Sequence, residues 1–260
     1  MTSIKKGDFS TLANDYAAYR PSYNEALTND IVRNHPVGTD KLRAADVGAG
    51  TGIFTRLLVK AGAATVTAVE PNDNMRAAGA KMSTGPEFGK IRWMKGSAEQ
   101  TGLDDRSVDL VSMASSFHWA DTEVALAEFD RILSEHGVFV AIWNPRITEK
   151  SEVETIIQNE LVDHFGLKNR VSSGRSGIAE KMTDILSESP YFGSVTYVEA
   201  TDVVERSPAD YVGAWRSVND IRAQLGEENF SEFIEFVEKT VATRESVPVH
   251  YLTRAWIAQK

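Results

Sequence analysis

Between residues 42 and 143, five short apolar runs alternate with segments whose apolar residues recur at helical spacing. Nearly uninterrupted apolar runs are typical of strands that helices cover on both faces. The predicted strands are Leu42–Val47, Ala64–Val69, Ile91–Met94, Val108–Met113 and Val138–Trp143, and the predicted helices are Ile53–Ala61, Asn74–Met82 and Glu123–Leu133. Strands that alternate with helices in this way predict an α/β fold with a mostly parallel, doubly wound sheet.

The pattern differs on either side of this region. Upstream, aromatic residues recur in a polar segment that precedes a helix predicted over residues 24–34. Downstream, the pattern predicts helices at Val153–Phe165, Ser207–Leu225 and Phe230–Val241, a loop at Ser172–Gly177, and strands at Ser194–Val204 and Tyr251–Ala258. We interpret the segment that contains the loop as an insertion or cap over a site on the sheet.

Composition narrows the class of partner. The 260 residues include 28 basic and 37 acidic side chains, a net charge of −9, which disfavours nucleic acid and anionic lipid and favours a small-molecule partner. Cysteine is absent, which excludes disulfides, thiolate metal sites and a cysteine nucleophile. The first residues are polar, and no apolar run approaches the roughly 20 residues of a membrane span, so we expect a cytoplasmic protein.

A glycine-rich turn joins the first predicted strand to the helix after it. Its sequence is Asp46-Val47-Gly48-Ala49-Gly50-Thr51-Gly52, in which the glycines permit a tight turn and close approach of a ligand to the backbone. A dinucleotide-binding turn follows G-x-G-x-x-G, which would require glycine at position 53, but this residue is Ile53. The register therefore disfavours a nicotinamide cofactor.

Three further segments are expected to meet this turn. Glu70 ends the second predicted strand, about 20 positions beyond the glycines, where a carboxylate can accept both hydroxyls of a ribose. Gly96–Glu99 follows the third strand, and residues 114–119 follow the fourth. Because ligands of α/β sheets bind outside the carboxyl ends of the strands, these segments predict one nucleoside site.

Together, Asp46–Gly52, Glu70 and Gly96–Glu99 resemble the motifs of the class I S-adenosylmethionine (SAM)-dependent methyltransferases, in particular the small-molecule, trans-aconitate-methyltransferase-like and type 11 members. The lead-in Y-x-x-Y-R-P-x-Y at residues 16–23 is similar to a lid segment of that family. The resemblance spans roughly residues 9–145. It implies a Rossmann-like sheet of seven strands with the last strand antiparallel and a helical cap, and a monomer or homodimer. It also implies SAM as cofactor, S-adenosylhomocysteine as product, and in-line methyl transfer to a small-molecule acceptor.

The resemblance also implies which residues form the cofactor site. Glu70 would hold the ribose, Ser97 and the Ala98 amide would meet the adenine, and Arg20 would pair with the carboxylate of the cofactor. The implied set, without a metal ion, is Tyr16, Arg20, Asp46, Gly48, Ala49, Gly50, Thr51, Glu70, Pro71, Met75, Ser97, Ala98, Glu99, Ala114, Ser115, His118 and Trp119.

Residues near the acceptor are less constrained. His118, Tyr16 and Asn144 are candidate catalytic residues, although His118 can equally be a packed core histidine. Other candidates for the acceptor side are Trp143, Arg146, Arg175, Trp215 and Arg216, of which Trp215 fits a cap core better. Arg146 and Arg175 would suit a carboxylate-bearing acceptor, but a surface ion pair explains each of them at least equally well.

These features predict four parts of the chain. Residues 1–40 form a lid and the first helix, 41–148 the SAM-binding core, 149–190 the cap insertion, and 191–260 the strands and helices that complete the sheet. Two alternatives to methyl transfer stay open: intramolecular cyclisation of SAM with release of methylthioadenosine, and SAM binding without catalysis.

Overall fold

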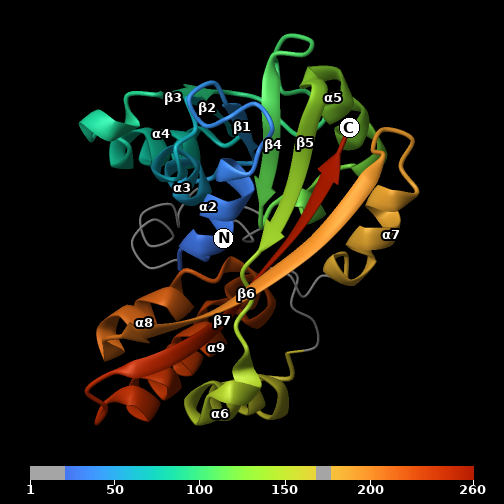
Figure 1. Cartoon of the computed structure of the whole chain (residues 1–260). Helices are drawn as coiled ribbons and strands as arrows, with labels where there is room; N and C mark the ends of the chain where they lie inside the picture. The colour runs from blue at the N-terminus through green and yellow to red at the C-terminus, as the bar shows by residue number, and fades with distance from the viewer. Residues whose placement is uncertain (1–20, 168–176) are drawn as a thin grey trace.

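The computed structural model describes residues 21–167 and 177–260, which form one twisted seven-stranded sheet with helices packed around it (Figure 1). The strands are β1 (Arg43–Val47), β2 (Thr65–Val69), β3 (Ile91–Met94), β4 (Val108–Ala114), β5 (Leu133–Trp143), β6 (Ser194–Arg206) and β7 (Val247–Gln259). The helices are α2 (Glu25–Arg33), α3 (Ile53–Ala61), α4 (Asp73–Met82), α5 (Thr122–Ile132), α6 (Glu152–Asp163), α7 (Met182–Ser187), α8 (Pro208–Arg216) and α9 (Asn219–Val241). Short 3₁₀ turns are η1 (Pro86–Phe88), η2 (Phe117–Trp119), η3 (Thr148–Lys150) and η4 (Ala179–Lys181).

The strand order is β3-β2-β1-β4-β5-β7-β6. The first five strands are parallel, and β7 runs antiparallel between β5 and β6. Chain order reverses between β1 and β4, where the connections to the two sides of the sheet diverge and open a crevice at the carboxyl ends of the strands. The fold predicted from the sequence, with its antiparallel last strand, is confirmed.

Two apolar layers enclose the sheet. On one face, Leu58 of α3 and Val32 of α2 pack against strand residues such as Val140. On the other face, Phe129 of α5 and Leu186 of α7 pack against Phe139. Because strands β1, β4 and β5 carry apolar residues on both faces, their sequences read as the uninterrupted runs from which they were predicted.

A third apolar cluster lies apart from these layers. It joins α6, α8 and α9 to the first half of β7, with Trp215, Phe233 and Tyr251 at its centre. Figure 1 shows these helices together at the end of the molecule opposite α5. We call this group, α6, α8, α9 and Val247–Tyr251, the C-terminal module.

Local details correct several predicted boundaries. The predicted helix Ser207–Leu225 is two helices, because α8 ends at Arg216 and the Ser217 hydroxyl donates to the carbonyl of Ala214. The structure also adds α7, which the sequence pattern had not indicated. Strand β7 begins four residues earlier than predicted, since its alternating pattern extends along β6 beyond the rest of the sheet.

Candidate functional site

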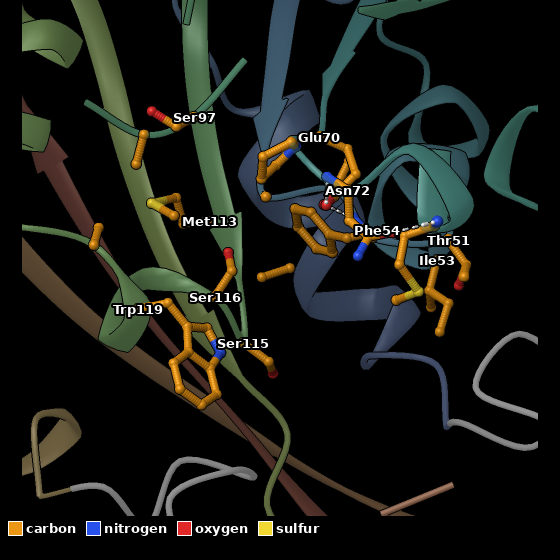
Figure 2. A pocket seen from close by; sticks show the side chains of 18 of the residues that line it. Thr51, Ile53, Phe54, Glu70, Asn72, Ser97, Met113, Ser115, Ser116 and Trp119 are labelled. Atoms are coloured by element: carbon orange, nitrogen blue, oxygen red, sulfur yellow. Dashed lines mark hydrogen bonds between the residues drawn. The ribbon is translucent and has the colours of Figure 1, made fainter. Parts of the chain in front are cut away.

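A cavity of about 390 Å³ lies at the carboxyl ends of β1, β2 and β4, within the roughly 300–1,000 Å³ typical of small-molecule sites. Figure 2 shows its two walls, with Thr51, Phe54 and Glu70 on one side and Ser115, Ser116 and Trp119 on the other. The lining residues are Tyr23, Gly48, Ala49, Gly50, Thr51, Ile53, Phe54, Glu70, Pro71, Asn72, Met75, Ser97, Ala98, Glu99, Met113, Ala114, Ser115, Ser116, Trp119 and Ala120.

The three glycines of the turn have positive φ angles but different surroundings. A Cβ atom on Gly48 would lie 2.8 Å from the side chain of Ser116, and one on Gly52 would lie 2.8 Å from the ring of Trp93. A Cβ atom on Gly50 would meet only the methyl carbon of Met75, at 3.5 Å. Gly48 and Gly52 are thus required by packing, whereas Gly50 leaves room on the cavity side for a ligand.

Glu70 lies at the tip of β2 and is 7% exposed. Its Oε2 accepts a hydrogen bond of 2.8 Å from the amide of Gly50, and its Oε1 accepts one of 2.8 Å from the amide of Asn72. Burial raises the pKa of this carboxyl group, while the two amide donors oppose that shift. A carboxylate has about four acceptor positions, so two remain for the hydroxyls of a ligand in the cavity.

Asp46 does not line the cavity. It is fully buried, and its carboxylate accepts hydrogen bonds from Thr55 Oγ1 at 2.6 Å and Ser112 Oγ at 2.9 Å. Burial raises its pKa to about 6, against the opposing effect of the two hydroxyls. Asp46 therefore ties β1 to α3 and β4 behind the glycine turn.

Thr51 and the start of α3 add polar groups to the same wall. The Thr51 hydroxyl oxygen is buried and has no hydrogen-bond partner within the described part of the chain. Helix α3 begins after Gly52, whose lack of a side chain leaves the helix without a side-chain cap. An unpaired buried hydroxyl is costly unless a ligand satisfies it, so this wall suits a polar ligand.

The opposite wall is held in a strained conformation. Ser115 has a φ angle of +54°, which is unusual for a residue with a side chain, and its amide donates to the carbonyl of Ile142. The Tyr23 hydroxyl donates to Ser115 Oγ at 2.9 Å, and Ser116 Oγ donates to the carbonyl of Val47 at 3.2 Å. These bonds connect the segment before α2 to the wall that follows β4.

His118 and Trp119 are adjacent but have different surroundings. Trp119 is 43% exposed and lines the cavity, whereas His118 does not line it. Burial lowers the pKa of His118 to about 4, partly offset by the negative charge of Asp220. Its Nδ1 lies 3.5 Å from Nε1 of Trp143, and its Nε2 has no hydrogen-bond partner among residues 21–167 and 177–260. His118 is therefore neutral near pH 7.

Most of the predicted cofactor residues meet at this cavity. Of those described, only Asp46 and His118 do not line it, and Tyr16 and Arg20 lie outside the described residues. Seven further residues line the cavity that were not in the set of predicted cofactor residues, namely Tyr23, Ile53, Phe54, Asn72, Met113, Ser116 and Ala120. Most of these directly adjoin predicted residues, so sequence proximity was the signal that could have found them.

The acceptor-side candidates within the described residues do not line the cavity. Asn144 donates to the carbonyl of Ser22 at 2.7 Å and accepts from Thr253 Oγ1 at 2.9 Å, so it connects the segment before α2 to β7. Trp143 is fully buried within the sheet layers, and Trp215 lies in the core of the C-terminal module.

The two arginine candidates that the structure describes do not line the cavity either. Arg146 is paired with the buried carboxylate of Glu154 and lies 4.5 Å from the ring centroid of Trp215. Arg216 forms an exposed pair with Glu238. Arg175 lies outside the described residues. Arg146 is thus engaged inside the protein, and a carboxylate-binding role for Arg146 together with Arg175 stays a prediction.

Comparisons with known proteins agree with this architecture. The sequence profile of a family described as "Methyltransferase domain" matches residues 45–141. An uncharacterised methyltransferase of Schizosaccharomyces pombe is 26% identical over 97% of this chain and 96% of that protein. A methyltransferase-like protein of the same yeast is 33% identical over 53% of this chain, and the match spans only about half of that relative, 52%.

A solved structure from Anaeromyxobacter dehalogenans, assigned as a type II methyltransferase, shares the fold with a TM-score of 0.69. It is 20% identical, and the match covers 93% of this chain and 98% of that one. None of the described helices combines the length and apolar character needed to cross a bilayer. In the same residues, no group of three acidic or histidine side chains could hold a metal ion.

Proposed function

We propose that the chain is a member of the class I SAM-dependent methyltransferase superfamily and that it transfers the methyl group of SAM to a small-molecule acceptor by in-line displacement. The observation that carries this proposal is the buried carboxylate of Glu70, which lines the cavity beside the open position at Gly50.

The residues present fit SAM chemically. Glu70 retains acceptor capacity for ribose hydroxyls, and the unpaired Thr51 hydroxyl can bond a polar group of the cofactor. Met75 and Ala98 supply apolar surface at the same cavity, and the loop at Ser97–Glu99 is fixed by a hydrogen bond between the Ser97 amide and the Gln100 carbonyl.

When bound, SAM supplies a methyl group on a sulfonium centre that is already strongly electrophilic. The protein then has to orient an acceptor and exclude water rather than activate the cofactor. Tyr23, Ser115 and Trp119 are suited to this role, because they line the wall opposite the glycine turn and are held by the Tyr23–Ser115 hydrogen bond. A proton-accepting role for His118 would require its neutral imidazole to reach the acceptor from behind that wall.

The acidity of the whole chain supports a small molecule over nucleic acid as acceptor. The cavity volume, about 390 Å³, is on the scale of one or two small molecules and not of a folded partner.

The experiment supplies SAM labelled in the methyl group together with cell extract separated into small molecules, protein and nucleic acid. We expect label in the small-molecule fraction and S-adenosylhomocysteine as product. Label confined to protein or nucleic acid would contradict the small-molecule acceptor. Methylthioadenosine formed from SAM alone would replace methyl transfer by cyclisation, and tight SAM binding without product in any fraction would indicate a binding protein.

A further inference from the structure

The ring of Trp93 in β3 lies against Gly52 at the end of the glycine turn. Trp93 is in register with Ala68 of β2, two residues before Glu70. It does not line the cavity, and its indole nitrogen is buried with no partner within the described residues. The ring is therefore held by packing and not by a hydrogen bond.

Two glycines from different elements make room for this ring. A Cβ atom on Gly79 of α4 would lie 2.2 Å from Trp93, and one on Gly52 would lie 2.8 Å from it. Gly52 carries a positive φ angle at the start of α3, but Gly79 lies inside a helix with no positive φ, where glycine normally weakens the helix. The reason for glycine at position 79 is thus the ring of Trp93.

Each of these glycines is close in sequence to a residue that lines the cavity. Gly52 follows Thr51, and Gly79 lies one helical turn after Met75 on the same face of α4. Met75 in turn supplies the atom nearest to a Cβ on Gly50. Trp93 consequently packs against Gly52, which ends the glycine turn, and against Gly79 of α4, the helix that carries Met75.

Arg56 also restrains the glycine turn at Thr51 and Gly52. Its Nη1 donates to the carbonyl of Thr51 at 2.8 Å and lies 3.1 Å from the Cβ position of Gly52. Arg56 thus restrains the turn by a hydrogen bond to the backbone of Thr51, and Trp93 restrains it through steric contact with Gly52.

We propose that Trp93 is a positioning residue for the cofactor site, whose ring sets the spacing between the glycine turn and α4 and thereby the affinity for the cofactor. It acts through Gly52 and Gly79 and does not touch the ligand. The affinity readout rests on the proposed function, but the effect on the turn does not.

The first measurement is binding of S-adenosylhomocysteine by calorimetry to the unsubstituted protein and to Trp93→Phe. We expect roughly tenfold weaker binding in the variant, because a small displacement of groups that contact a ligand is enough for such a loss. The control is Trp256→Phe in β7, which removes the same atoms from a buried tryptophan and also a hydrogen bond to Thr183, so it should cost at least as much stability as Trp93→Phe. Equal loss of affinity in both variants would mean general destabilisation and would overturn the proposal.

A second experiment exploits Gly79. In the unsubstituted protein, Gly79→Ala should weaken binding and lower the melting temperature, because the new methyl group meets the distal ring atoms of Trp93. In a Trp93→Phe background those atoms are gone, so the same substitution should leave affinity unchanged and raise the melting temperature, since alanine favours the helix. Equal effects of Gly79→Ala in both backgrounds would refute contact between the two residues.

Amide hydrogen exchange without ligand separates this inference from the proposed function. Exchange at Gly50 and Gly52 should be faster in Trp93→Phe than in Trp256→Phe, because the turn loses its support. Unchanged exchange would overturn the positioning role. If the unsubstituted protein fails to bind S-adenosylhomocysteine, the proposed function fails, while the exchange result still decides the role of Trp93.

Discussion

Two buried glutamates are stabilised in opposite ways. Glu70 lies in the part of the molecule formed by β1 to β5 and the helices between them, which we call the cofactor half, and Glu154 lies in the C-terminal module. Glu70 accepts hydrogen bonds from two backbone amides and faces the cavity. Glu154 is 1% exposed and accepts from Arg146 at 3.2 and 3.3 Å and from the Tyr211 hydroxyl at 2.7 Å. One carboxylate keeps its charge available to a ligand, and the other is satisfied inside the protein.

The different donors of Glu70 and Glu154 suggest a way to distinguish a ligand-binding carboxylate from a structural one. Backbone amides position Glu70 without neutralising it, so its remaining acceptor positions can recognise a ligand. The acceptor positions of Glu154 are instead taken by the Arg146 guanidinium and the Tyr211 hydroxyl. Glu154 thereby connects α6 to α8 and to the segment after β5. Burial alone therefore does not identify a functional carboxylate; the identity of its donors does.

The largest expected effect is on the structural side. Glu154→Ala removes the buried carboxylate that pairs with the Arg146 guanidinium, and this loss of one member of a largely buried ion pair should lower the free energy of unfolding by about 3–5 kcal/mol. Urea unfolding measures this loss, and Glu152→Ala, an exposed position of the same helix, is the control. A loss close to that of the control would show that the pair is not the anchor of the module.

The next effect should appear in binding and not in stability. Glu70→Gln removes the charge that faces the cavity and should weaken SAM binding by about 2–3 kcal/mol, the cost of charged hydrogen bonds. Calorimetry measures it against Asp73→Asn, an exposed carboxylate nearby that pairs with Arg76 and Lys95. Unchanged affinity in Glu70→Gln would place this residue in the same structural class as Glu154.

Asp46 tests the comparison from within the cofactor half, because it is buried there yet lacks contact with the cavity. Its pKa is raised from 3.8 to about 6 by burial, so the folded state binds its proton more tightly than the unfolded state does. Stability from this group is hence greatest at low pH and is lost as pH rises from about 4 to 6, amounting to about 2 kcal/mol between pH 4.5 and pH 7.

Urea unfolding of the unsubstituted protein and of Asp46→Asn across this range isolates the contribution. Glu70 shifts in the same direction through burial, so only the difference between the two proteins is informative. Parallel pH profiles would mean that Asp46 is not the buried acid responsible.

The smallest effect is expected at the surface. Arg216→Ala breaks an exposed pair with Glu238 and should change stability by less than about 0.5 kcal/mol and leave methyl transfer unchanged. Assays of unfolding and of product formation check this. A large loss of methyl transfer without a loss of stability would support the prediction that Arg216 contacts the acceptor.

The cofactor half was readable from the sequence because its site is assembled from neighbouring strand ends. Glycines 48, 50 and 52 and Glu70 lie at the carboxyl ends of β1 and β2, which are adjacent in the sheet. In a parallel sheet these ends meet at one edge, so spacing along the chain translates directly into proximity. The C-terminal helices were less predictable, since α8 and α9 are separated by two residues and α9 contains the non-helical Gly226.

The sequence by itself determined the alternation of strands and helices from β1 to β5, the glycine turn and the carboxylate after β2, because each depends on local pattern and spacing. Only the tertiary structure decided which side chains face the cavity. His118 does not line it, Asn144 forms hydrogen bonds with Ser22 and Thr253, and Arg146 pairs with Glu154. Gly79 is required by Trp93, which comes from another element. These outcomes depend on contacts between residues far apart in the chain, where packing and desolvation choose among orientations that the local sequence leaves open.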